Sequence, residues 1–581
     1  MASIDRRTEY SVFIRRWVGF VSAIWLMALS GSYGFANYST ALKDVLGLNQ
    51  KQLNRLSVGK DLGDSSGILA GILCNYVSAS TLLCIGAVVG LVGNGTQWLV
   101  VSEIISPPPY WIMFLLAAVA GNTISWMNTS VFTLSVRNFP RNRGPVAGLF
   151  KAYMGLSAAI FSHLCDYFFA SSASKYLLML STIPPIFCLI TAMFFRPVPP
   201  SGTAEDDKVE QQSLFVFTIM SIGLAVLLVV KNLVPGLQEG IALPVVTAIL
   251  FVLLAAPALV PLLLFFKVKR KAVGMAYPIE GSNGVSGDSN GTLDVSAKPI
   301  EEDELRKPLL DQTEIIVEGD KSSLSNGLAE HKSGWLSLSA IHLGEDWPTL
   351  SLFKTWHSYV LYTTLFFGTG SGMAFANNLG QVGQSFGFST VTLFTSLFSL
   401  GNFFGRITSG NVSEYFLKTM STPRPAWIGV VKLPMIALFL WLSFGSAVSL
   451  YAGSLIVGFS HGSFITLTIP TISEFYGLKY FGTNYMVLNT HILAGSIIFS
   501  GIIAGYLYDL HATYQDGDSS LTCYGASCYG TTFRLYAGCL TVGLLVDVLL
   551  SFISRHLYRR FKDINTHIKN STVHKPTEDR N

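Results

Sequence analysis

The chain has 581 residues, of which half are hydrophobic and only 13% are charged. A soluble protein of this length could not cover so many apolar side chains with so few charges, and the same composition excludes disordered, collagen-like and disulfide-rich proteins. The net charge of +4 also excludes a nucleic-acid binder that relies on a basic surface. The composition therefore predicts a polytopic membrane protein with the lipid bilayer as a partner.

Apolar runs of about 20 residues, each long enough to cross a bilayer as a helix, follow one another in a 6 + 2 + 6 order. The predicted spans are 17–38, 57–77, 80–101, 110–135, 145–168 and 176–195, then 214–232 and 242–266, and finally 356–376, 389–411, 426–444, 447–470, 485–508 and 533–553. The first run is too long and too polar at its end for a cleaved signal peptide. The sequence predicts an all-α protein with about 14 transmembrane helices.

These spans predict five regions. They are an N-terminal six-helix bundle (1–200), two additional helices (201–266), a disordered loop (267–350), a C-terminal six-helix bundle (351–556) and a tail (557–581). The loop is rich in Gly, Ser, Asn, Asp and Glu and has no apolar periodicity. The additional helices carry few polar side chains, so we expect them to be peripheral and lipid-facing, unless they complete the second bundle.

Lys and Arg concentrate on one side of the predicted membrane. They are Arg6, Arg7, Arg15, Arg16, Arg137, Arg141, Arg143, Lys267, Lys269, Arg270, Lys271, Arg555, Arg559, Arg560 and Lys562. The positive-inside rule then predicts that both termini and the long loop are cytosolic. The membrane itself, plasma membrane or an endomembrane such as vacuole or endoplasmic reticulum, stays open. In the loop, Glu301–Leu310 resembles an acidic dileucine signal for sorting adaptors, and a solvated charge run is the alternative.

The two six-helix blocks repeat each other at an offset of 338 to 340 residues. The matching positions are Phe35-Ala36-Asn37 and Phe375-Ala376-Asn377, Gly47 and Gly387, Gly144 and Gly482, and Ser157–Ser162 and Gly495–Ser500. Two similar bundles can pack open to one side of the membrane or to the other, and a polar site between them then meets each side in turn. The repeat therefore predicts an alternating-access transporter.

Four stretches resemble the nodulin-like branch of the major facilitator superfamily in plants. They are Gly31–Ser39 (GSYGFANYS), Leu46–Gly71, Asn138–Ser162 and Phe475–Asn489 (FYGLKYFGTNYMVLN). The chain is also similar to proteins called nuclear-fusion-defective-like, and more distantly its arrangement resembles oxalate/formate and monocarboxylate carriers. The resemblance implies the major facilitator fold with added helices. The chain departs from the superfamily signature after the second span, where Gly71–Asn75 brings no Lys or Arg, so a gating salt bridge is in doubt there.

Ionisable side chains inside a membrane are costly, so each is a candidate functional group. Lys60 and Asp61 lie in the second span, where either lines the pathway for an anion or a proton. Alternatively they are a structural pair near the water boundary, and Lys60 shares a helix face with Asp64. Lys151 and Tyr153 lie in the fifth span, where Lys151 either binds substrate or extends toward the cytosolic surface.

Two histidines are candidate proton carriers, because the ordinary pKa of histidine is about 6.5. His491 is the repeat partner of Tyr153, and His461 has the region of Asn122 and Trp126 as its counterpart. The alternative for His461 is a hydrogen bond between helices.

Further polar candidates are expected to face the space between the bundles. Asn37, Tyr38 and Asn377 lie on the first helix of each block, where an amide binds a polar solute or another helix. Arg406 either holds a carboxylate with two hydrogen bonds or anchors the cytosolic edge through Glu414 or lipid phosphate.

Cys523 and Cys528 lie in a loop predicted on the non-cytosolic side, where an oxidising compartment favours a disulfide. No nucleotide-binding, metalloprotease or hydrolase motif is present, so we expect no enzyme activity, no cofactor and no metal site. The prediction is a secondary active transporter of a small, polar, anionic solute, with coupling to protons left open. The alternative is a non-transporting membrane regulator that keeps the transporter fold.

Overall fold

The computed structural model describes residues 2–31, 34–48, 50–170, 172–198, 204–237, 240–266, 346–388, 392–511, 513–514 and 521–573, and these are nearly all helical. The sorting motif at Glu301–Leu310 and almost all of the loop predicted at 267–350 lie outside the described residues.

The N-terminal bundle contains six spans, of which the first two are interrupted. Its helices are α1 (Ala2–Ala28), α2 (Ala36–Leu46), α3 (Gln50–Ser65), α4 (Ile68–Leu73), α5 (Ala79–Val101), α6 (Tyr110–Asn138), α7 (Arg143–Phe169) and α8 (Ala173–Phe194). The first span breaks near Gly31, which has a positive φ of 64°. α2 ends at Gly47, also left-handed, a common end for a helix.

Two helices and two short 3-10 turns follow: α9 (Ala204–Leu233), η1 (Pro235–Leu237), α10 (Ala242–Ala255) and η2 (Ala256–Ala258). The sequence predicts a peripheral, lipid-facing pair, and α9 does expose apolar side chains such as Phe215 and Ile219, while its opposite face packs against the bundle. Phe217 of α9 is fully buried and packs against Trp17 and Phe20 at centroid distances of 5.9 and 5.2 Å. Glu210 and Lys231 of α9 are also buried. Sequence hydropathy could not reveal the buried face of α9, because the few polar side chains on it find their partners in the bundle.

The C-terminal bundle repeats the six-span order. Its elements are α13 (Thr349–Leu352), α14 (Trp356–Ser385), α15 (Thr392–Met420), α16 (Arg424–Leu442), α17 (Ala447–Tyr476), α18 (Phe481–Asn489), α19 (His491–Gly495), η4 (Ser496–Ala504), α20 (Gly505–His511), β1 (Thr513–Tyr514), β2 (Leu521–Thr522) and α21 (Ser527–Val573). The segment η4 is a π-helix, and the two strands pair antiparallel. α21 continues well beyond residue 556, where the bundle was predicted to end.

Ten described helices are long and apolar enough to cross a membrane by themselves. The other four predicted spans are α1–α2, α3–α4, α14 and α15, which are the first and second spans of each bundle. Two of these four are interrupted, and α14 and α15 contain more polar residues. The repeat therefore extends to composition, because the interrupted or more polar spans are the first and second of both bundles.

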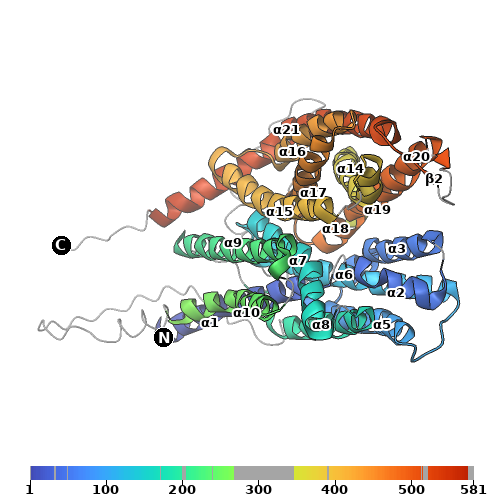
Figure 1. Cartoon of the computed structure of the whole chain (residues 1–581). Helices are drawn as coiled ribbons and strands as arrows, with labels where there is room; N and C mark the ends of the chain where they lie inside the picture. The colour runs from blue at the N-terminus through green and yellow to red at the C-terminus, as the bar shows by residue number, and fades with distance from the viewer. Residues whose placement is uncertain are drawn as a thin grey trace, which may run out of the picture.

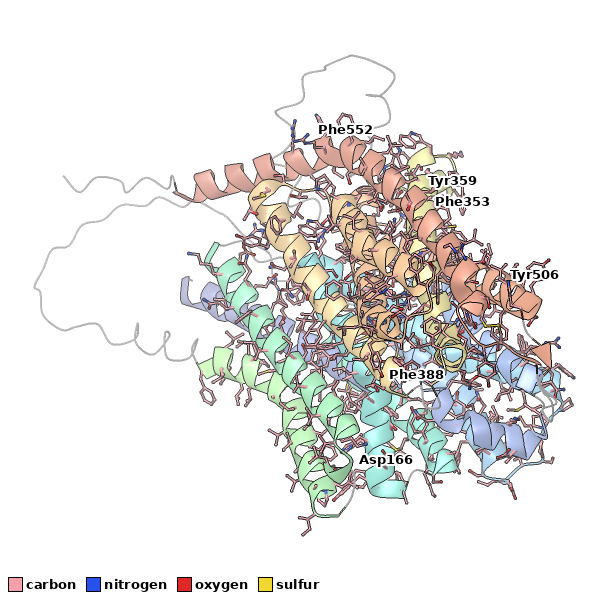
Figure 2. All side chains as sticks on the ribbon, turned by 45° about the horizontal axis from the view of Figure 1, so that its top comes forward. Asp166, Phe353, Tyr359, Phe388, Tyr506 and Phe552 are labelled. Carbon is pink, nitrogen blue, oxygen red and sulfur yellow. A yellow bond between two sulfur atoms is a disulfide. The ribbon has the colours of Figure 1, made fainter. Side chains whose placement is uncertain are left out.

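The two bundles lie side by side with their helices roughly parallel, and α9 runs along the junction (Figure 1). We call the end where α1 begins and α21 ends the tail side, and the end with β1 and β2 the disulfide side. Large aromatic side chains such as Tyr359, Tyr506 and Phe552 are exposed on the outer faces of the C-terminal bundle (Figure 2). Exposed apolar surface of this kind fits contact with lipid.

Candidate functional site

The bundles meet along two seams that the repeat relates to each other. One seam joins α7 to α15, and the other joins α4 to α18. A Cβ atom on Gly144 would lie 2.6 Å from the oxygen of Gly410, and one on Gly71 would lie 3.0 Å from that of Gly482. Gly71 and Gly144 correspond to Gly410 and Gly482 in the repeat, so equivalent glycines let the backbones approach at both seams.

Charged groups close the α7–α15 seam on the tail side. Glu414 accepts a hydrogen bond from the backbone N–H of Gly144 across the seam (3.2 Å) and binds Arg424 (2.7 Å). Arg424 also binds Glu474 (2.7 Å), which accepts a hydrogen bond from Tyr558 (2.8 Å). A carboxylate at the start of α7 is favoured because the first N–H groups of a helix have no partner within it.

Hydrogen bonds from Asn75, Thr483 and Arg137 close the α4–α18 seam. Asn75, at the position equivalent to Glu414, donates to the hydroxyl of Thr483 (2.7 Å), which donates to the carbonyl of Gly71 (2.6 Å). Arg137 of α6 donates to the carbonyls of Leu478 and Lys479 at 3.0 and 3.2 Å. The sequence departs from the superfamily signature here, and the structure has Asn75 at this seam where the other seam has the ion-paired Glu414.

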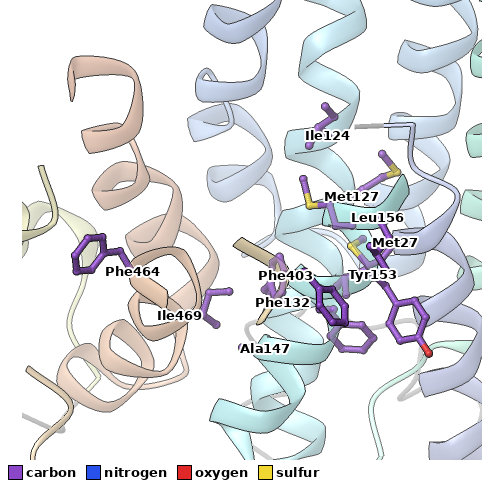
Figure 3. Close-up of a cluster of buried hydrophobic side chains, with 14 of the residues drawn as sticks. Met27, Ile124, Met127, Phe132, Ala147, Tyr153, Leu156, Phe403, Phe464 and Ile469 are labelled. Carbon is purple, nitrogen blue, oxygen red and sulfur yellow. The ribbon is translucent and has the colours of Figure 1, made fainter. Parts of the chain in front are cut away.

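A cluster of charges lies buried between the bundles above the α7–α15 seam. Lys151 and Arg406 are 5% and 3% exposed, and Arg406 Nη1 donates to the backbone oxygen of Lys151. The ammonium of Lys151 lies 4.6 Å from the ring centroid of Phe132 and interacts electrostatically with Asp64 and Arg406. Phe132 and Phe403 appear near this junction in Figure 3. Lys151 therefore interacts with both a second cation and a carboxylate, and the two cations are buried while Asp64 is half-buried.

Lys60 and Asp61 lie at the edge of this cluster. Both are half-buried, and both interact electrostatically with Asp64. No ion pair within 4 Å joins Lys60 to Asp64 in the described part of the chain, so the suggested structural pair is not formed. The structure brings Lys60, Asp61, Lys151 and Arg406 into one neighbourhood.

The two histidines are buried in the C-terminal bundle near the cluster. The Nδ1 of His461 and the Nε2 of His491 have no hydrogen-bond partner among the described residues. His491 Nδ1 donates to the carbonyl of Leu488 (2.6 Å), and His461 interacts electrostatically with Arg406 and His491. Each histidine thus keeps one ring nitrogen available.

Asn122 and Trp126 join helices. Asn122 donates to the carbonyl of Gly63 (3.0 Å) and to the hydroxyl of Ser66 (3.0 Å), and it accepts from Trp126 Nε1 (2.6 Å). These bonds connect α6 to the end of α3. Tyr153 is 1% exposed, and its hydroxyl has no partner among the described residues.

The amides at the first span of each block lie apart from the charge cluster. Asn37 is exposed, and the neighbouring Tyr38 packs against Tyr176 at a ring-centroid distance of 6.2 Å. Asn377 is also exposed and donates to Ser496 (3.2 Å). The hydrogen bond of Asn377 is thus to a neighbouring segment of its own bundle.

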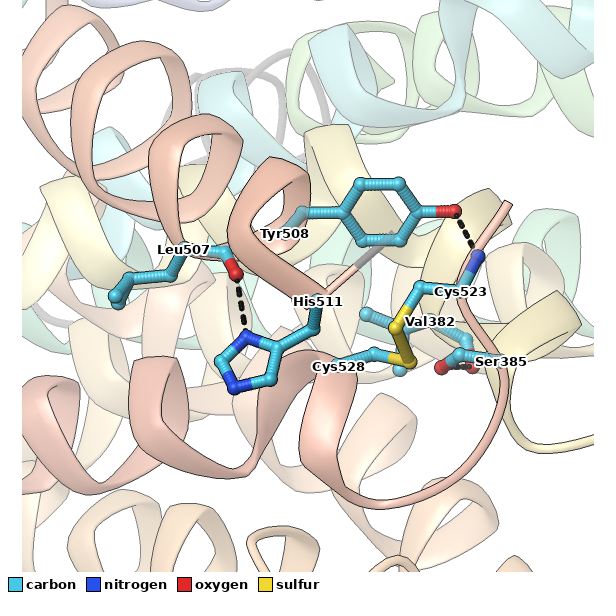
Figure 4. Close-up of a disulfide and its surroundings, with 7 residues drawn as sticks. All are labelled: Val382, Ser385, Leu507, Tyr508, His511, Cys523 and Cys528. Atoms are coloured by element: carbon cyan, nitrogen blue, oxygen red, sulfur yellow. Dashed lines mark hydrogen bonds between the residues drawn. A yellow bond between two sulfur atoms is a disulfide. The ribbon is translucent and has the colours of Figure 1, made fainter. Parts of the chain in front are cut away.

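A disulfide joins Cys523, in the loop after β2, to Cys528 in the first turn of α21 (Figure 4). Tyr508 accepts a hydrogen bond from the backbone N–H of Cys523 (3.1 Å), which fastens the loop to α20. No group of three or more His, Cys, Asp or Glu side chains among the described residues is placed to hold a metal.

The sequence interpretation missed a buried ion pair inside the C-terminal bundle. Lys432 of α16 and Asp547 of α21 are fully buried and lie 2.5 Å apart, and both hydrogen-bond Thr364 of α14. Lys432 and Asp547 both lie within predicted spans. The rule that an ionisable side chain in a span is a candidate functional group, which selected Lys60, would therefore have identified them. A cavity of about 510 Å³ between α14 and α21, lined by Phe367, Arg534 and Gly538, is near this pair and not at the charge cluster.

Comparisons with known proteins match nearly the whole chain. Residues 16–262 match the nodulin-like family model, and residues 349–560 match the model for the NFD4 C-terminal domain. The chain is 30% identical over 557 residues to Protein NUCLEAR FUSION DEFECTIVE 4 of Arabidopsis thaliana, which covers 94% of this chain and 90% of that protein. It is 27% identical over 205 residues to the probable transporter MCH1 of Yarrowia lipolytica, which covers 33% of this chain and 41% of the relative.

Solved structures with a similar course of the chain are transporters. The fucose:proton symporter FucP of E. coli is 15% identical, with a TM-score of 0.48 over 93% of this chain and 99% of that one. The proton:xylose symporter XylE is 11% identical, with a TM-score of 0.48 over 92% and 94%.

Proposed function

Because the chain belongs to the nodulin-like family and has the major facilitator fold, we propose that it is a secondary active transporter of a small polar anion. The observation that carries this proposal is the pair of buried cations, Lys151 and Arg406, between the bundles. With Lys60, Asp61 and Asp64, the neighbourhood holds three cations and two carboxylates, and the remaining positive charge is one that a bound anion would balance. Buried charge of this kind is expensive in a membrane and is kept where function needs it.

The tail-side contacts support alternating access. Both seams are closed on the tail side, so the state described is closed toward that side. Opening it would separate Gly144 from Gly410 and Gly71 from Gly482, while each bundle keeps its own core. We assign the tail side to the cytosol, because the predicted loops there carry most of the Lys and Arg. The chain is similar over part of its length to proteins named probable transporters, which agrees with this role.

Lys151 and Arg406 are the anion-binding residues in this proposal, and Asp61, His461 and His491 are the candidates for proton coupling. The free ring nitrogens of the two histidines support a role in proton transfer. Lys60 and Tyr153 remain candidate ligands beside the cluster, and Tyr38 is a candidate that interacts electrostatically with Asp61. Asn122 and Asn377 donate hydrogen bonds to other segments, and Trp126 donates to Asn122, so these three contribute to binding in this proposal only if those bonds exchange for a solute. Asn37 remains a candidate ligand on the first span.

Replacing Lys151 by methionine is expected to reduce uptake of anions about 10- to 100-fold, because a charged hydrogen-bond partner contributes roughly 1.5–3 kcal/mol. The measurement is initial uptake of labelled lactate, malate, nitrate and, as a neutral probe, glucose into proteoliposomes. Each is measured with and without an inward proton gradient.

Lys175→Met is the matched control, because Lys175 is an exposed lysine at the start of α8. Lys151→Arg, which keeps the charge, should retain part of the activity. Equal anion uptake by the Lys151→Met and Lys175→Met proteins would contradict the assigned site. No uptake of any probe by the unmodified protein would favour the regulatory alternative.

A further inference from the structure

α9 belongs to neither six-helix repeat, yet it contacts both bundles. It packs against α7 of the N-terminal bundle and α15 of the C-terminal bundle, and it lies along the junction in Figure 1. Its residue Glu210 is only 3% exposed. A buried carboxylate is costly unless its partners compensate it, so the partners of Glu210 show what this position does.

The partners of Glu210 come from the N-terminal half of the molecule. Arg16 of α1 lies 3.5 Å from one carboxylate oxygen, and the side-chain amide of Asn142 donates to the other at 2.5 Å. Asn142 follows α6 and precedes α7, and its amide also donates to Asp207 of α9 at 3.3 Å. The carboxylates of α9 therefore fix the orientation of the Asn142 amide, with its nitrogen toward α9.

The oxygen of the same amide faces the other bundle. Lys418 of α15 donates to Asn142 Oδ1 at 2.6 Å and also interacts electrostatically with Glu210. Asn142 thus links the carboxylate of Glu210 on α9 to the ammonium of Lys418 on the other side of the α7–α15 seam. Hydrogen bonds with an ionised partner are stronger than neutral ones.

This connection joins the charged contacts that close the seam. Lys418 lies 3.8 Å from Glu414, which binds both Arg424 and the backbone N–H of Gly144. We call Arg16, Glu210, Asn142, Lys418 and Glu414 the tail-side network. It connects α1, α9, the start of α7 and α15, and it requires the closed arrangement because Lys418 and Asn142 belong to different bundles.

Where the chain enters the C-terminal bundle, Asp346 contacts the second seam, which joins α4 to α18. Asp346 accepts hydrogen bonds from the backbone N–H groups of Leu478 and Lys479 at 2.9 and 3.0 Å. Arg137 of the N-terminal bundle donates to the carbonyls of the same two residues. Two parts of the segment between the bundles therefore contact the seams. Asp346 contacts the α4–α18 seam, and α9 contacts the charged α7–α15 seam.

We propose that α9 is a regulatory element that stabilises the tail-side-closed state through Glu210. The inference rests on the proposed transport cycle, because it concerns the balance between closed and open states of the tail side. Withdrawal of the first turns of α9 removes the acceptor that orients Asn142 and attracts Lys418. The closed state is then less favoured, although every contact within the bundles remains.

The test is hydrogen exchange, measured by mass spectrometry, on the full chain carrying Glu210→Gln. Glutamine keeps the size of the side chain but removes the charge that holds Arg16 and Asn142. We expect exchange about 5- to 30-fold faster in peptides covering the start of α7 and residues 410–418. No solute or transport enters this measurement, so a chain that fails in uptake assays can still support the inference.

The matched control is Asp166→Asn. Asp166 binds Lys231 of α9 at 3.0 Å, and this pair attaches α9 to α7 near α10, away from the tails (Figure 2). Loss of this pair loosens α9 without touching a group that crosses the seam, so exchange at the start of α7 should stay unchanged. Equal exchange there in the two variants would overturn the inference. Faster exchange throughout the Glu210→Gln protein, including α5, would overturn it as well, because the effect would then be general instability.

Discussion

Replacing Arg424 by glutamine is expected to destabilise the protein by roughly 3–5 kcal/mol, the usual cost of removing one partner from buried ion pairs. Arg424 is 1% exposed, and its guanidinium binds Glu474 (2.7 Å), Glu414 (2.7 Å) and the hydroxyl of Ser413 (2.8 Å). Glutamine would leave two buried carboxylates without their cation. The measurement is the thermal unfolding of the purified protein in detergent.

Two further variants make this result specific. Arg534→Gln changes an exposed arginine whose hydrogen bond goes to its own helix, at the carbonyl of Gly530, and it should shift stability by no more than about 0.5 kcal/mol. Arg424→Lys keeps the charge but loses the planar donor group, so it should fall between the two. If Arg424→Gln unfolds at the temperature of Arg534→Gln, the central role of Arg424 at this seam is wrong.

Replacing Gly405 by leucine is expected to have the second large effect. A Cβ atom at this position would overlap the backbone carbonyl of Phe459 on α17. Because a backbone atom cannot rotate away, α15 must move, at a cost at or above the upper end of the roughly 1–3 kcal/mol typical of overpacking. Gly401 and Gly462 make equally close contacts along the same pair of helices.

This substitution should also affect the charge cluster, since Arg406 follows Gly405 directly. The measurements are the fraction of monodisperse protein after solubilisation, the unfolding temperature and anion uptake. Gly538→Leu is the matched control, because Gly538 lies in the interior of α21 and a Cβ atom there would meet no other described atom within 4 Å. We expect that variant to keep its fold, and similar losses in both would refute the packing argument.

Helix positions follow closely from the sequence where an apolar run is bounded by polar or helix-breaking residues. The span predicted at 145–168 is α7 (Arg143–Phe169), and the run at 242–266 begins where α10 begins. The prediction is poorer where helices contain polar residues. α3 begins at Gln50 instead of 57, and the first span is broken near Gly31, because hydropathy does not record a local change of backbone conformation.

The candidate site was predictable in its members but not in its contacts. Lys151 and Arg406 are conspicuous as charges in apolar runs. The departure from the superfamily signature after Gly71 anticipates that the α4–α18 seam has Asn75 where the α7–α15 seam has the ion-paired Glu414. That Arg406 donates to the backbone of Lys151 depends on how two bundles pack, which no local pattern encodes. Asn122 is a similar case, because its amide joins α6 to α3 and its residue type alone fits either role.

The π-helix η4 gives the two halves different mechanics. Its sequence matches the stretch Ser157–Ser162, which is ordinary α-helix within α7. Side chains from neighbouring helices hold the wider winding: Asn377 and Asn378 donate to hydroxyls of Ser496 and Ser500, and Tyr536 donates to the carbonyl of Phe499 (2.7 Å). Rewinding these nine residues into α geometry would turn α20 about its own axis. By rewinding η4, the C-terminal half can therefore rotate α20 about its axis, a motion that the N-terminal half lacks.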